Sequence, residues 1–207
     1  MTEIQNILDV ETLIKDVDAV IFDLDDTLYP EKEYVRSGYK KIAEALGRPE
    51  VADRMWEVFE RGGKAIDEVL ESEDLFWFRE DALRIYRYQQ PDIRLYKGVY
   101  DMLSRIRAMG KKIGIITDGR PEGQRAKLDA LKIEAEYIIV TDELGGTEFR
   151  KPCTKAFCLM QKLLKIPFSR MVYVGDNLQK DFIAPKELGM KSIWVRNGDG
   201  IYGGRNK

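Results

Sequence analysis

Two short segments of the sequence place carboxylates directly after apolar runs. The run AVIF leads into DLDDT, which contains Asp23 and Asp25, and the run MVYV leads into GDN, which contains Asp176; Asp181 follows closely. In an extended chain alternate side chains share a side, so Asp23 and Asp25 can face one way while Asp26 faces another. Carboxylates gathered this closely repel one another unless a cation lies among them. A hard ion that prefers oxygen ligands, most plausibly Mg²⁺, would satisfy this requirement.

Two further apolar runs end in groups that suit an anionic ligand. The run KIGIIT ends at Thr117 and continues into Asp118, Gly119 and Arg120, and the run YIIV leads into a loop that carries Lys151. The Thr117 hydroxyl and the amides around Asp118 and Gly119 can donate hydrogen bonds to anionic oxygens, and Lys151 supplies a positive charge. Arg120 either helps to hold an anionic substrate or only flanks a helix start. Together with a metal, these groups suit phosphoryl transfer, in which catalysis is mostly positioning and charge stabilisation.

Five apolar runs predict the strands that would bring these groups together. Four of the runs are nearly continuous in Val, Ile, Phe and Tyr, which is typical of parallel strands buried on both faces. The expected strands are Asp18–Asp23, Lys112–Thr117, Tyr137–Val140, Met171–Val174 and Lys191–Val195, and the helices expected between the later ones are Val99–Met109, Pro121–Leu131, Thr154–Lys165 and about Asp181–Leu188. This alternation predicts an α/β fold with a doubly wound parallel sheet, which binds ligands beyond the carboxyl ends of its strands.

Residues 30–94 interrupt the alternation. They contain no strand-like run, are rich in charged and aromatic residues, and have breaks near residues 47–49 and 62–63, so we expect three or four helices there. The aromatic side chains are more often the core of such a block than a ligand site. We therefore expect a core formed by residues 1–29 and 95–207, with a helical subdomain at 30–94. The tail, residues 197–207, is rich in Gly and polar residues and is expected to be a loop.

Composition excludes several classes of protein. The 207 residues include no histidine, which excludes Ser-His and Cys-His relays and His-ligated zinc or haem. The 34 basic and 36 acidic residues give a net charge of −2, unlike a dedicated nucleic-acid binder, and no run of apolar residues is long enough to span a membrane. Cys153 and Cys158 lie too close together for a disulfide framework and predict buried free thiols. We expect a cytoplasmic protein with neither a nucleic-acid nor a membrane partner.

Four segments, taken in order, resemble the motifs of the haloacid dehalogenase superfamily. They are AVIFDLDDTL, IGIITDGR, RKP and VYVGDNLQKDF, and the resemblance extends from Asp18 to Val195. Residues 30–94 occupy the place of the helical cap that this superfamily inserts between its first and second motifs. The resemblance implies a Rossmann-like core, a Mg²⁺ cofactor and a covalent aspartyl intermediate.

The same resemblance implies a role for each acidic residue of the motifs. Asp23 matches the nucleophile, and Asp25 matches the general acid and base that protonates the leaving oxygen and then activates water. Mg²⁺ would be held by the Asp23 carboxylate, the Asp25 carbonyl and Asp176, while Asp181 would orient the waters of the metal. An aspartate at position 25 resembles the phosphatases of the superfamily rather than its dehalogenases.

The phosphate-binding positions of the superfamily fall on Thr117 and Lys151, and the implied activity is hydrolysis of a small phosphorylated metabolite. Two alternatives share much of the pattern. A phosphomutase would return the phosphoryl group to a sugar instead of water. A receiver-like signalling module also combines acidic residues, Thr and Lys on a parallel sheet, but its phosphorylated Asp follows the third strand, whereas the acidic pairs here follow the first and fourth expected strands.

Overall fold

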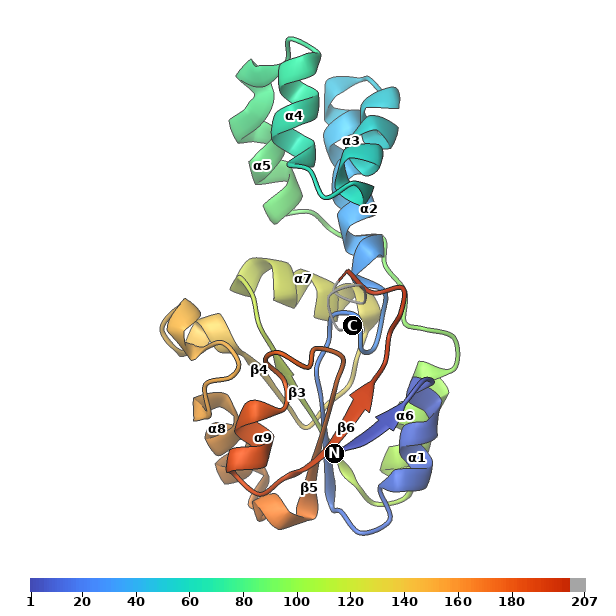
Figure 1. Ribbon diagram of the computed structural model, residues 1–207, viewed down its shortest axis with the longest axis vertical. Helices are drawn as coiled ribbons and strands as arrows, with labels where there is room; N and C mark the ends of the chain where they lie inside the picture. Colours follow the sequence, from blue (N-terminus) through green and yellow to red (C-terminus); the bar gives the residue numbers. More distant parts are fainter. Residues whose placement is uncertain (202–207) are drawn as a thin grey trace.

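A parallel sheet of six strands forms the centre of the computed structural model, which describes residues 1–201 (Figure 1). Its strand order is β1-β6-β5-β2-β3-β4, and every neighbouring pair is parallel. The strands are β1 (Thr2–Ile4), β2 (Ala19–Phe22), β3 (Lys112–Thr117), β4 (Tyr137–Val140), β5 (Met171–Gly175) and β6 (Lys191–Val195). The predicted α/β fold with a parallel sheet is confirmed.

The register of the central strands brings their carboxyl ends to one edge of the sheet. Phe22, the last residue of β2, lies opposite Ile115 of β3 and Val174 of β5. The backbone N–H of Asp23 continues this pairing and donates to the carbonyl of Val174 at 2.8 Å. The residues that follow β2, β3 and β5 therefore emerge side by side, as the prediction of a site at this edge requires.

Helices cover both faces of the sheet. Val20 and Phe22 of β2 belong to a core cluster with side chains of α1 (Val10–Leu13), α6 (Val99–Ala108) and α7 (Pro121–Leu131). Ala19 and Ile21 point to the other face, where they join side chains of α8 (Lys155–Leu164) and α9 (Ile183–Glu187). All four residues of β2 are fully buried, and burial of each large apolar side chain contributes roughly 1.5–3 kcal/mol. This two-sided covering confirms the doubly wound arrangement.

Three elements differ from the sequence-based expectation, one of which is the short helix α1, where no helix was expected. Strand β1 was not predicted because only Ile4 among its three residues is buried, so no apolar run marks this edge strand. Helix α9 begins at Ile183 rather than at Asp181, whose carboxylate accepts the N–H of Asn177 at 2.9 Å within a turn. Pro185 lies in the first turn of α9, where a missing N–H leaves no helical hydrogen bond unmade.

Residues 31–87 form a separate group of helices above the sheet (Figure 1). They are α2 (Glu31–Leu46), α3 (Glu50–Glu60), α4 (Ala65–Ser72) and α5 (Arg79–Arg87), with a 3₁₀ turn at Phe76–Phe78. Gly47 ends α2 in the left-handed conformation, with a φ of 66°, next to the break expected at residues 47–49. The helices share an apolar core of their own that contains Tyr39 and Met55, whereas Phe76 and Trp77 are exposed. We call this group the helical region.

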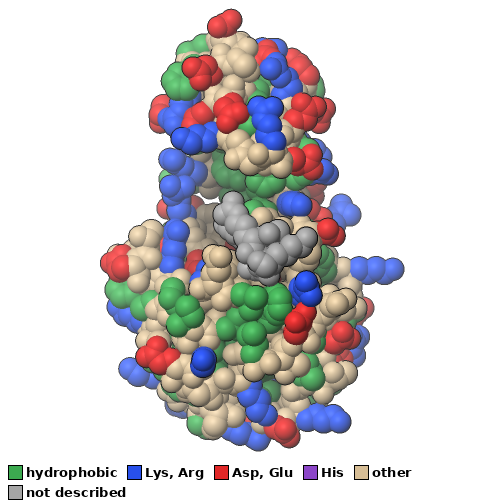
Figure 2. Space-filling view, in the orientation of Figure 1, with side chains coloured by type: hydrophobic (Ala, Val, Ile, Leu, Met, Phe, Trp, Pro, Cys, Tyr) green, Lys and Arg blue, Asp and Glu red, His purple; other side chains and the backbone are tan. Residues whose placement is uncertain are grey.

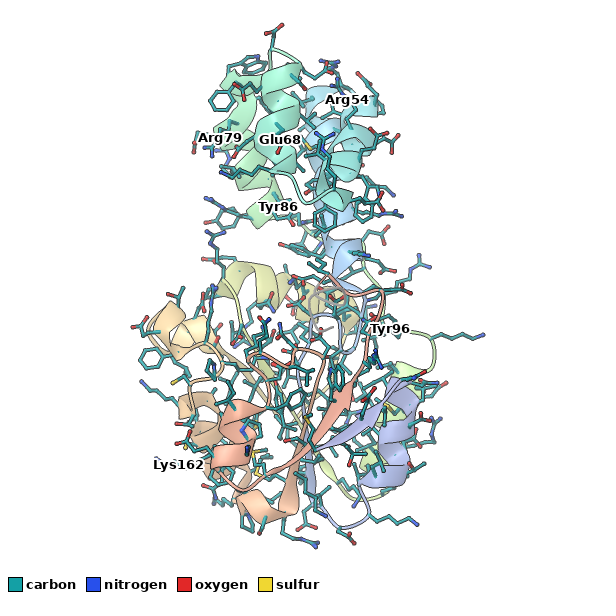
Figure 3. The ribbon with its side chains drawn as sticks, viewed as in Figure 1. Arg54, Glu68, Arg79, Tyr86, Tyr96 and Lys162 are labelled. Atoms are coloured by element: carbon teal, nitrogen blue, oxygen red, sulfur yellow. The ribbon has the colours of Figure 1, made fainter. Side chains whose placement is uncertain are left out.

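Two chain segments connect the helical region to the sheet, and the molecule narrows between the two parts (Figure 2). One segment enters α2 after Tyr29, and the other returns from α5 to α6. The backbone N–H of Tyr96 in the returning segment donates to the carbonyl of Leu28 at 3.0 Å, which ties the two connections together. Tyr86 lies at the end of α5 that faces the sheet (Figure 3).

The beginning of the C-terminal tail lies near the first loop of the sheet. Asn197 donates through its side chain to the carbonyl of Asp26 at 2.9 Å, and the N–H of Ile201 donates to the Asp26 carboxylate at 2.7 Å. The expected loop at 197–207 is thus described as far as residue 201, and residues 202–207 lie outside the described residues.

Both cysteines are free, as expected, but Cys153 and Cys158 are half-buried rather than buried. Over residues 1–201, no helix is both long and apolar enough to cross a membrane.

Candidate active site

A cavity of about 260 Å³ opens at the carboxyl ends of the strands. Its lining includes Asp23 after β2, Asp118 after β3 and Asp176 after β5. The remaining lining residues come from the loops after β2, β4 and β5 and from the first turn of α2: Asp25, Asp26, Glu31, Arg150, Lys151, Asn177 and Lys180. The structure therefore brings most of the predicted site residues to one cavity, while Thr117 and Asp181 are fully buried next to it.

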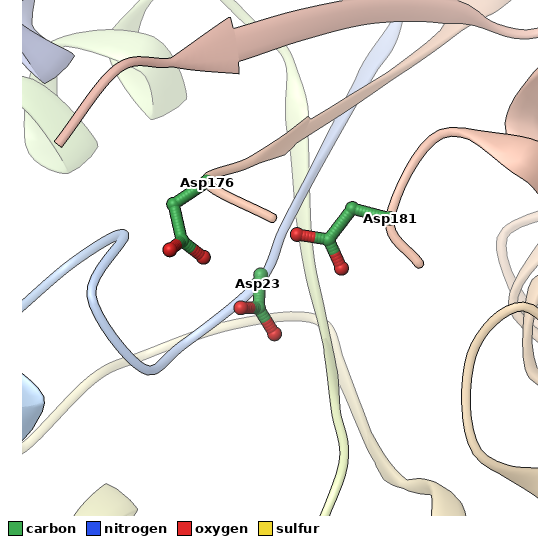
Figure 4. Close-up of side chains that lie close together, drawn as sticks. All are labelled: Asp23, Asp176 and Asp181. Carbon is green, nitrogen blue, oxygen red and sulfur yellow. The ribbon is translucent and has the colours of Figure 1, made fainter. Parts of the chain in front are cut away.

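Asp23, Asp176 and Asp181 point their carboxylates toward one another (Figure 4). One oxygen from each lies within 4.8 Å of the others, and all three side chains are buried. Burial, together with the neighbouring charges of Asp23 and Asp181, raises the pKa of Asp176 to about 9. Burial also raises the pKa of Asp23 to about 7, against the opposing charge of Lys151. Three clustered carboxylates, with the pKa values of Asp23 and Asp176 raised in the absence of a cation, fit a hard divalent ion such as Mg²⁺.

Replacement of Asp176 by Asn is expected to stabilise the metal-free protein at pH 8. The pKa of Asp176 is higher in the folded protein than the ordinary value of 3.8, so its ionisation destabilises the fold increasingly as the pH rises toward 9. Asn removes that charge, and we expect the melting temperature without metal to rise by about 4 °C, since roughly 2–4 °C corresponds to 1 kcal/mol at this size. Differential scanning calorimetry with EDTA and with Mg²⁺ measures the effect.

The same substitution should remove most of the stabilisation that Mg²⁺ confers on the native protein. Asp92→Asn is a matched control, because Asp92 is an exposed carboxylate far along the chain from the three aspartates. Asp92→Asn should leave the melting temperature unchanged both with EDTA and with Mg²⁺. A lower melting temperature of metal-free Asp176→Asn at pH 8 would contradict the assignment of charge repulsion to this cluster.

Lys151 is the buried cation beside Asp23 and Asp181. Its Nζ lies 2.6 Å from Oδ1 of Asp23, 2.8 Å from Oδ1 of Asp181 and 2.9 Å from the Tyr173 hydroxyl. Burial lowers the pKa of Lys151, but Asp181 and Asp23 outweigh that effect and raise it well above its ordinary value. Lys151 therefore remains charged and offsets part of the negative charge of the aspartates.

Asp25 faces the same cavity but is held by different partners. Its Oδ1 accepts from the Tyr29 hydroxyl and from Nζ of Lys127 at 2.6 Å, and its Oδ2 accepts from Nε2 of Gln124 at 2.8 Å. Burial raises the pKa of Asp25, but the Lys127 charge and these hydrogen bonds outweigh it and hold the pKa below the ordinary value. Gln124 also donates to the Thr117 hydroxyl and so links Thr117 to Asp25.

Sequence reasoning missed Gln124 and Lys127, although a signal was present. Both lie in α7, where Gln124, Lys127, Leu128 and Leu131 are spaced at i, i+3, i+4 and i+7, and all four are buried. That spacing marks the face of a helix that packs on a core. Two polar residues on such a face need polar partners, because burial without hydrogen bonds is unfavourable. Here the partner is Asp25.

The carboxylate of Asp118, in the segment after β3, links neighbouring loops, and the binding of phosphate by this segment stays a prediction. The Asp118 carboxylate accepts from the Thr141 hydroxyl at 3.0 Å, from the Lys151 N–H at 3.0 Å and from Nζ of Lys180 at 3.1 Å. These bonds connect three loops, so the Asp118 side chain orders the edge of the cavity. Arg120 is exposed and does not line this cavity; it lines a neighbouring one instead.

Five further residues of the cavity were absent from the predicted site: Asp26, Glu31, Arg150, Asn177 and Lys180. Glu31 is the first residue of α2, and burial together with the nearby Asp25 raises its pKa to about 8. Arg150 makes a bidentate ion pair with Asp142, with both N–O distances at 2.7 Å. Lys180 lies inside the segment VGDNLQKDF, so its closeness to Asp176 in the sequence could have indicated that it belongs to the site.

The fold and the site together define a hydrolase of the haloacid dehalogenase-like class. A family model described as haloacid dehalogenase-like hydrolase matches residues 17–189, and the chain belongs to this family. It is 28% identical over 199 residues to glyceraldehyde 3-phosphate phosphatase of Pyrococcus abyssi, a match that covers 88% of this chain and 82% of the relative. The enzyme of the same name from Methanocaldococcus jannaschii is 29% identical, with 88% and 86% covered.

Solved structures agree with this assignment. A phosphatase of the same family from Thermococcus onnurineus is 25% identical, with a TM-score of 0.55 over 92% of this chain and 97% of that one. The predicted membership of the superfamily is therefore confirmed, as is the prediction that the chain is an enzyme.

Proposed function

We propose that this chain is a Mg²⁺-dependent phosphomonoesterase that acts on a small phosphorylated metabolite through a phospho-aspartate at Asp23. The observation that carries the proposal is the position of the Asp23 carboxylate. It lies between Lys151, at 2.6 Å, and two further buried aspartates, and it shares a cavity with Asp25. The relatives named as phosphatases support the same reaction class.

In the first step an oxygen of Asp23 attacks phosphorus, and the bond between phosphorus and the ester oxygen breaks. Asp25 transfers its proton to that oxygen, so the product leaves as a neutral alcohol. In the second step Asp25 takes a proton from water, the water oxygen bonds to phosphorus, and the bond between phosphorus and Asp23 breaks. Phosphate leaves, and Asp25 is protonated again for the next cycle.

The surrounding residues prepare Asp23 and Asp25 for these steps. Lys151 reduces the negative charge that an incoming phosphate would meet at Asp23. Lys127 holds Asp25 as a carboxylate, which is the form that accepts the proton of water in the second step. The first step requires the protonated form, so the ion pair between Lys127 and Asp25 must weaken when substrate binds.

A Mg²⁺ ion would be held by Asp23, Asp176 and Asp181, whose carboxylates converge. When bound, it supplies positive charge that stabilises the phosphoryl oxygens in the transition state. The donors fit this ion because they are all hard oxygens, and because a cation would offset the burial and the carboxylate repulsion that together raise the pKa of Asp176.

We further infer that residues 30–94 form a cap domain over a core of residues 1–29 and 95–207. Glu31 of α2 contributes to the lining of the catalytic cavity, so the helical region reaches the site. A cavity of about 260 Å³ beneath such a cap favours small soluble substrates over phosphoproteins.

The proposal is tested by measuring phosphate release with and without Mg²⁺. With glyceraldehyde 3-phosphate and a panel of sugar phosphates, we expect phosphate release with Mg²⁺ and a loss of at least about 100-fold after EDTA treatment, restored by added Mg²⁺. A malachite green assay measures the product. Undiminished activity in EDTA would contradict the metal role, and transfer of the phosphoryl group to the sugar instead of water would indicate a mutase.

A further inference from the structure

A second cavity, of about 350 Å³, lies beside the catalytic one where the helical region meets α7. The two cavities share Glu31 and Arg150 in their linings, so they adjoin. The other lining residues come from α2, from the end of α5 and from the start of α7: Tyr34, Tyr86, Arg87, Arg120, Gly123, Gln124 and Lys127. Tyr86 marks its upper side in Figure 3, and α7 lies below the helical region in Figure 1.

The two cavities differ in charge. The catalytic cavity is lined by more acidic than basic side chains, as a metal site requires. The second cavity is lined by a single carboxylate, Glu31, and by four cations: Arg87, Arg120, Lys127 and Arg150. Figure 2 shows Lys and Arg side chains gathered along one side of the narrow part of the molecule, between the helical region and the sheet. A substrate that occupied both cavities would contact basic side chains at the end away from its reacting phosphate.

Two of these cations have no acidic partner among residues 1–201. Within residues 1–201, Lys127 pairs with Asp25 at 2.6 Å and Arg150 pairs with Asp142 at 2.7 Å, whereas Arg87 and Arg120 take part in no ion pair. Nearby arginines of α5 and α7 are neutralised, such as Arg84, which lies 2.6 Å from Asp81. Arg87 is the last residue of α5 and Arg120 directly precedes α7, so one comes from each side of the cavity.

A guanidinium group without a partner is suited to an anion, because its fixed fork of N–H donors matches the oxygens of a carboxylate or phosphate. The aromatic residues of the cavity are less suited to a nucleobase. The rings of Tyr34 and Tyr86 meet edge to face, with centroids 5.7 Å apart, and the Tyr34 ring also covers Nζ of Lys127 at 4.4 Å. They already pack against each other and against a cation, so no pair of parallel rings is open to a base.

We propose that the preferred substrate carries a second anionic group, which Arg87 and Arg120 bind while the reacting phosphate lies at Asp23. The proposal rests on the proposed phosphatase function and names the substrate class: phosphomonoesters of small metabolites with a carboxylate or a further phosphate. Arg87 lies on the cap and Arg120 on the core, so binding of this group also connects the two parts around the substrate.

Two matched pairs of substrates test the proposal. Glyceraldehyde 3-phosphate and 3-phosphoglycerate differ only in an aldehyde against a carboxylate, and ribulose 5-phosphate and ribulose 1,5-bisphosphate differ by one phosphate. We expect kcat/KM of the native enzyme to be at least about tenfold higher for the more anionic member of one or both pairs, the gain of one charge-assisted hydrogen-bonded contact. The pair that shows the preference distinguishes a carboxylate from a phosphate.

Substitutions of the two arginines test whether they cause the preference for the more anionic substrate. Arg87→Gln and Arg120→Gln should each lower the ratio of the two kcat/KM values about tenfold, while Arg84→Gln, one turn earlier on α5, should leave the ratio unchanged. Equal kcat/KM values within both pairs, or a ratio that the two variants do not change, would overturn the proposal. Neither result would affect the proposed phosphatase function, which fails only if no phosphomonoester is hydrolysed with Mg²⁺.

Discussion

Asp23→Asn is expected to abolish phosphate release, with a loss on the order of 10⁴-fold or more in kcat. The amide that replaces the carboxylate is a poor nucleophile and cannot form the covalent intermediate. It also replaces one of the three clustered carboxylates by a neutral amide and so removes the negative charge that lies closest to Lys151. Steady-state phosphate release with Mg²⁺ and with the best substrate of the panel measures the loss.

The neighbouring carboxylate supplies the control for this experiment. Asp26 lines the same cavity, but its carboxylate accepts the backbone N–H groups of Glu31 and Ile201 and so serves the turn. Asp26 adopts a φ of 53°, which Asn tolerates well, and Asp26→Asn should keep kcat within about tenfold of native. Circular dichroism should show that both variants are folded.

Acid quenching during turnover adds a direct readout. Intact-mass and peptide analysis of the quenched native enzyme should find one phosphoryl group on Asp23, and none in Asp23→Asn. Retention of more than about one hundredth of the native activity by Asp23→Asn would contradict the covalent mechanism. A phosphoprotein that is stable in the native chain, with negligible turnover, would instead favour the receiver-like alternative.

The sheet could be predicted from the sequence because its strands are buried on both faces. Strands β2 and β5 consist almost entirely of buried apolar residues, so continuous runs such as AVIF mark them without ambiguity. Strand β1 lies at the edge and buries only Ile4, so it is recognised through its pairing with β6 rather than through any local pattern. Glycines and prolines likewise marked the breaks between α2, α3 and α4, because they act locally.

The part of the site that follows the strand ends could be predicted for the same reason. Once the strands are parallel, Asp23, Thr117 and Asp176 must emerge at one edge, whatever the length of the loops between them. Residues contributed by helices could not be placed in this way. Lys127 reaches Asp25 from a helix face that resembles an ordinary core face. Arg87 lines the same cavity as Arg120 only through the position of the helical region, which depends on two connecting segments.

The partners of Asp25 also change how the acidic residues of the site are understood. From the sequence, Asp23 and Asp25 form one carboxylate pair. In the structure they belong to two separate networks. Asp23 lies with Lys151, Asp176 and Asp181, and Asp25 lies with Lys127, Gln124 and Tyr29. This separation suits a mechanism in which one carboxylate attacks phosphorus while the other exchanges protons, and it leads to a second strong prediction.

Asp25→Asn is expected to affect substrates according to the leaving group. The ester oxygen of a sugar phosphate leaves as an alcohol and needs a proton, and loss of the general acid should lower its rate of phosphoryl transfer by roughly 10²–10⁴-fold. The nitrophenolate of p-nitrophenyl phosphate is a stable anion that leaves without a proton. Its transfer to Asp23 should therefore be slowed far less, by about tenfold or less. Asn preserves the shape of the side chain and can still accept from Lys127 and Tyr29.

Rapid mixing separates the two chemical steps in this variant. With p-nitrophenyl phosphate, Asp25→Asn should release a burst of nitrophenolate close to one equivalent per enzyme and then stall, because no base remains to activate water. The phosphoryl group should persist on Asp23, whereas the sugar phosphate should give no burst. An equal loss of the transfer step with both substrates would show that Asp25 positions the substrate or metal instead of moving protons. Asp25 would then join the cluster around Asp23, and the proton donor would have to be sought among the other residues of the cavity.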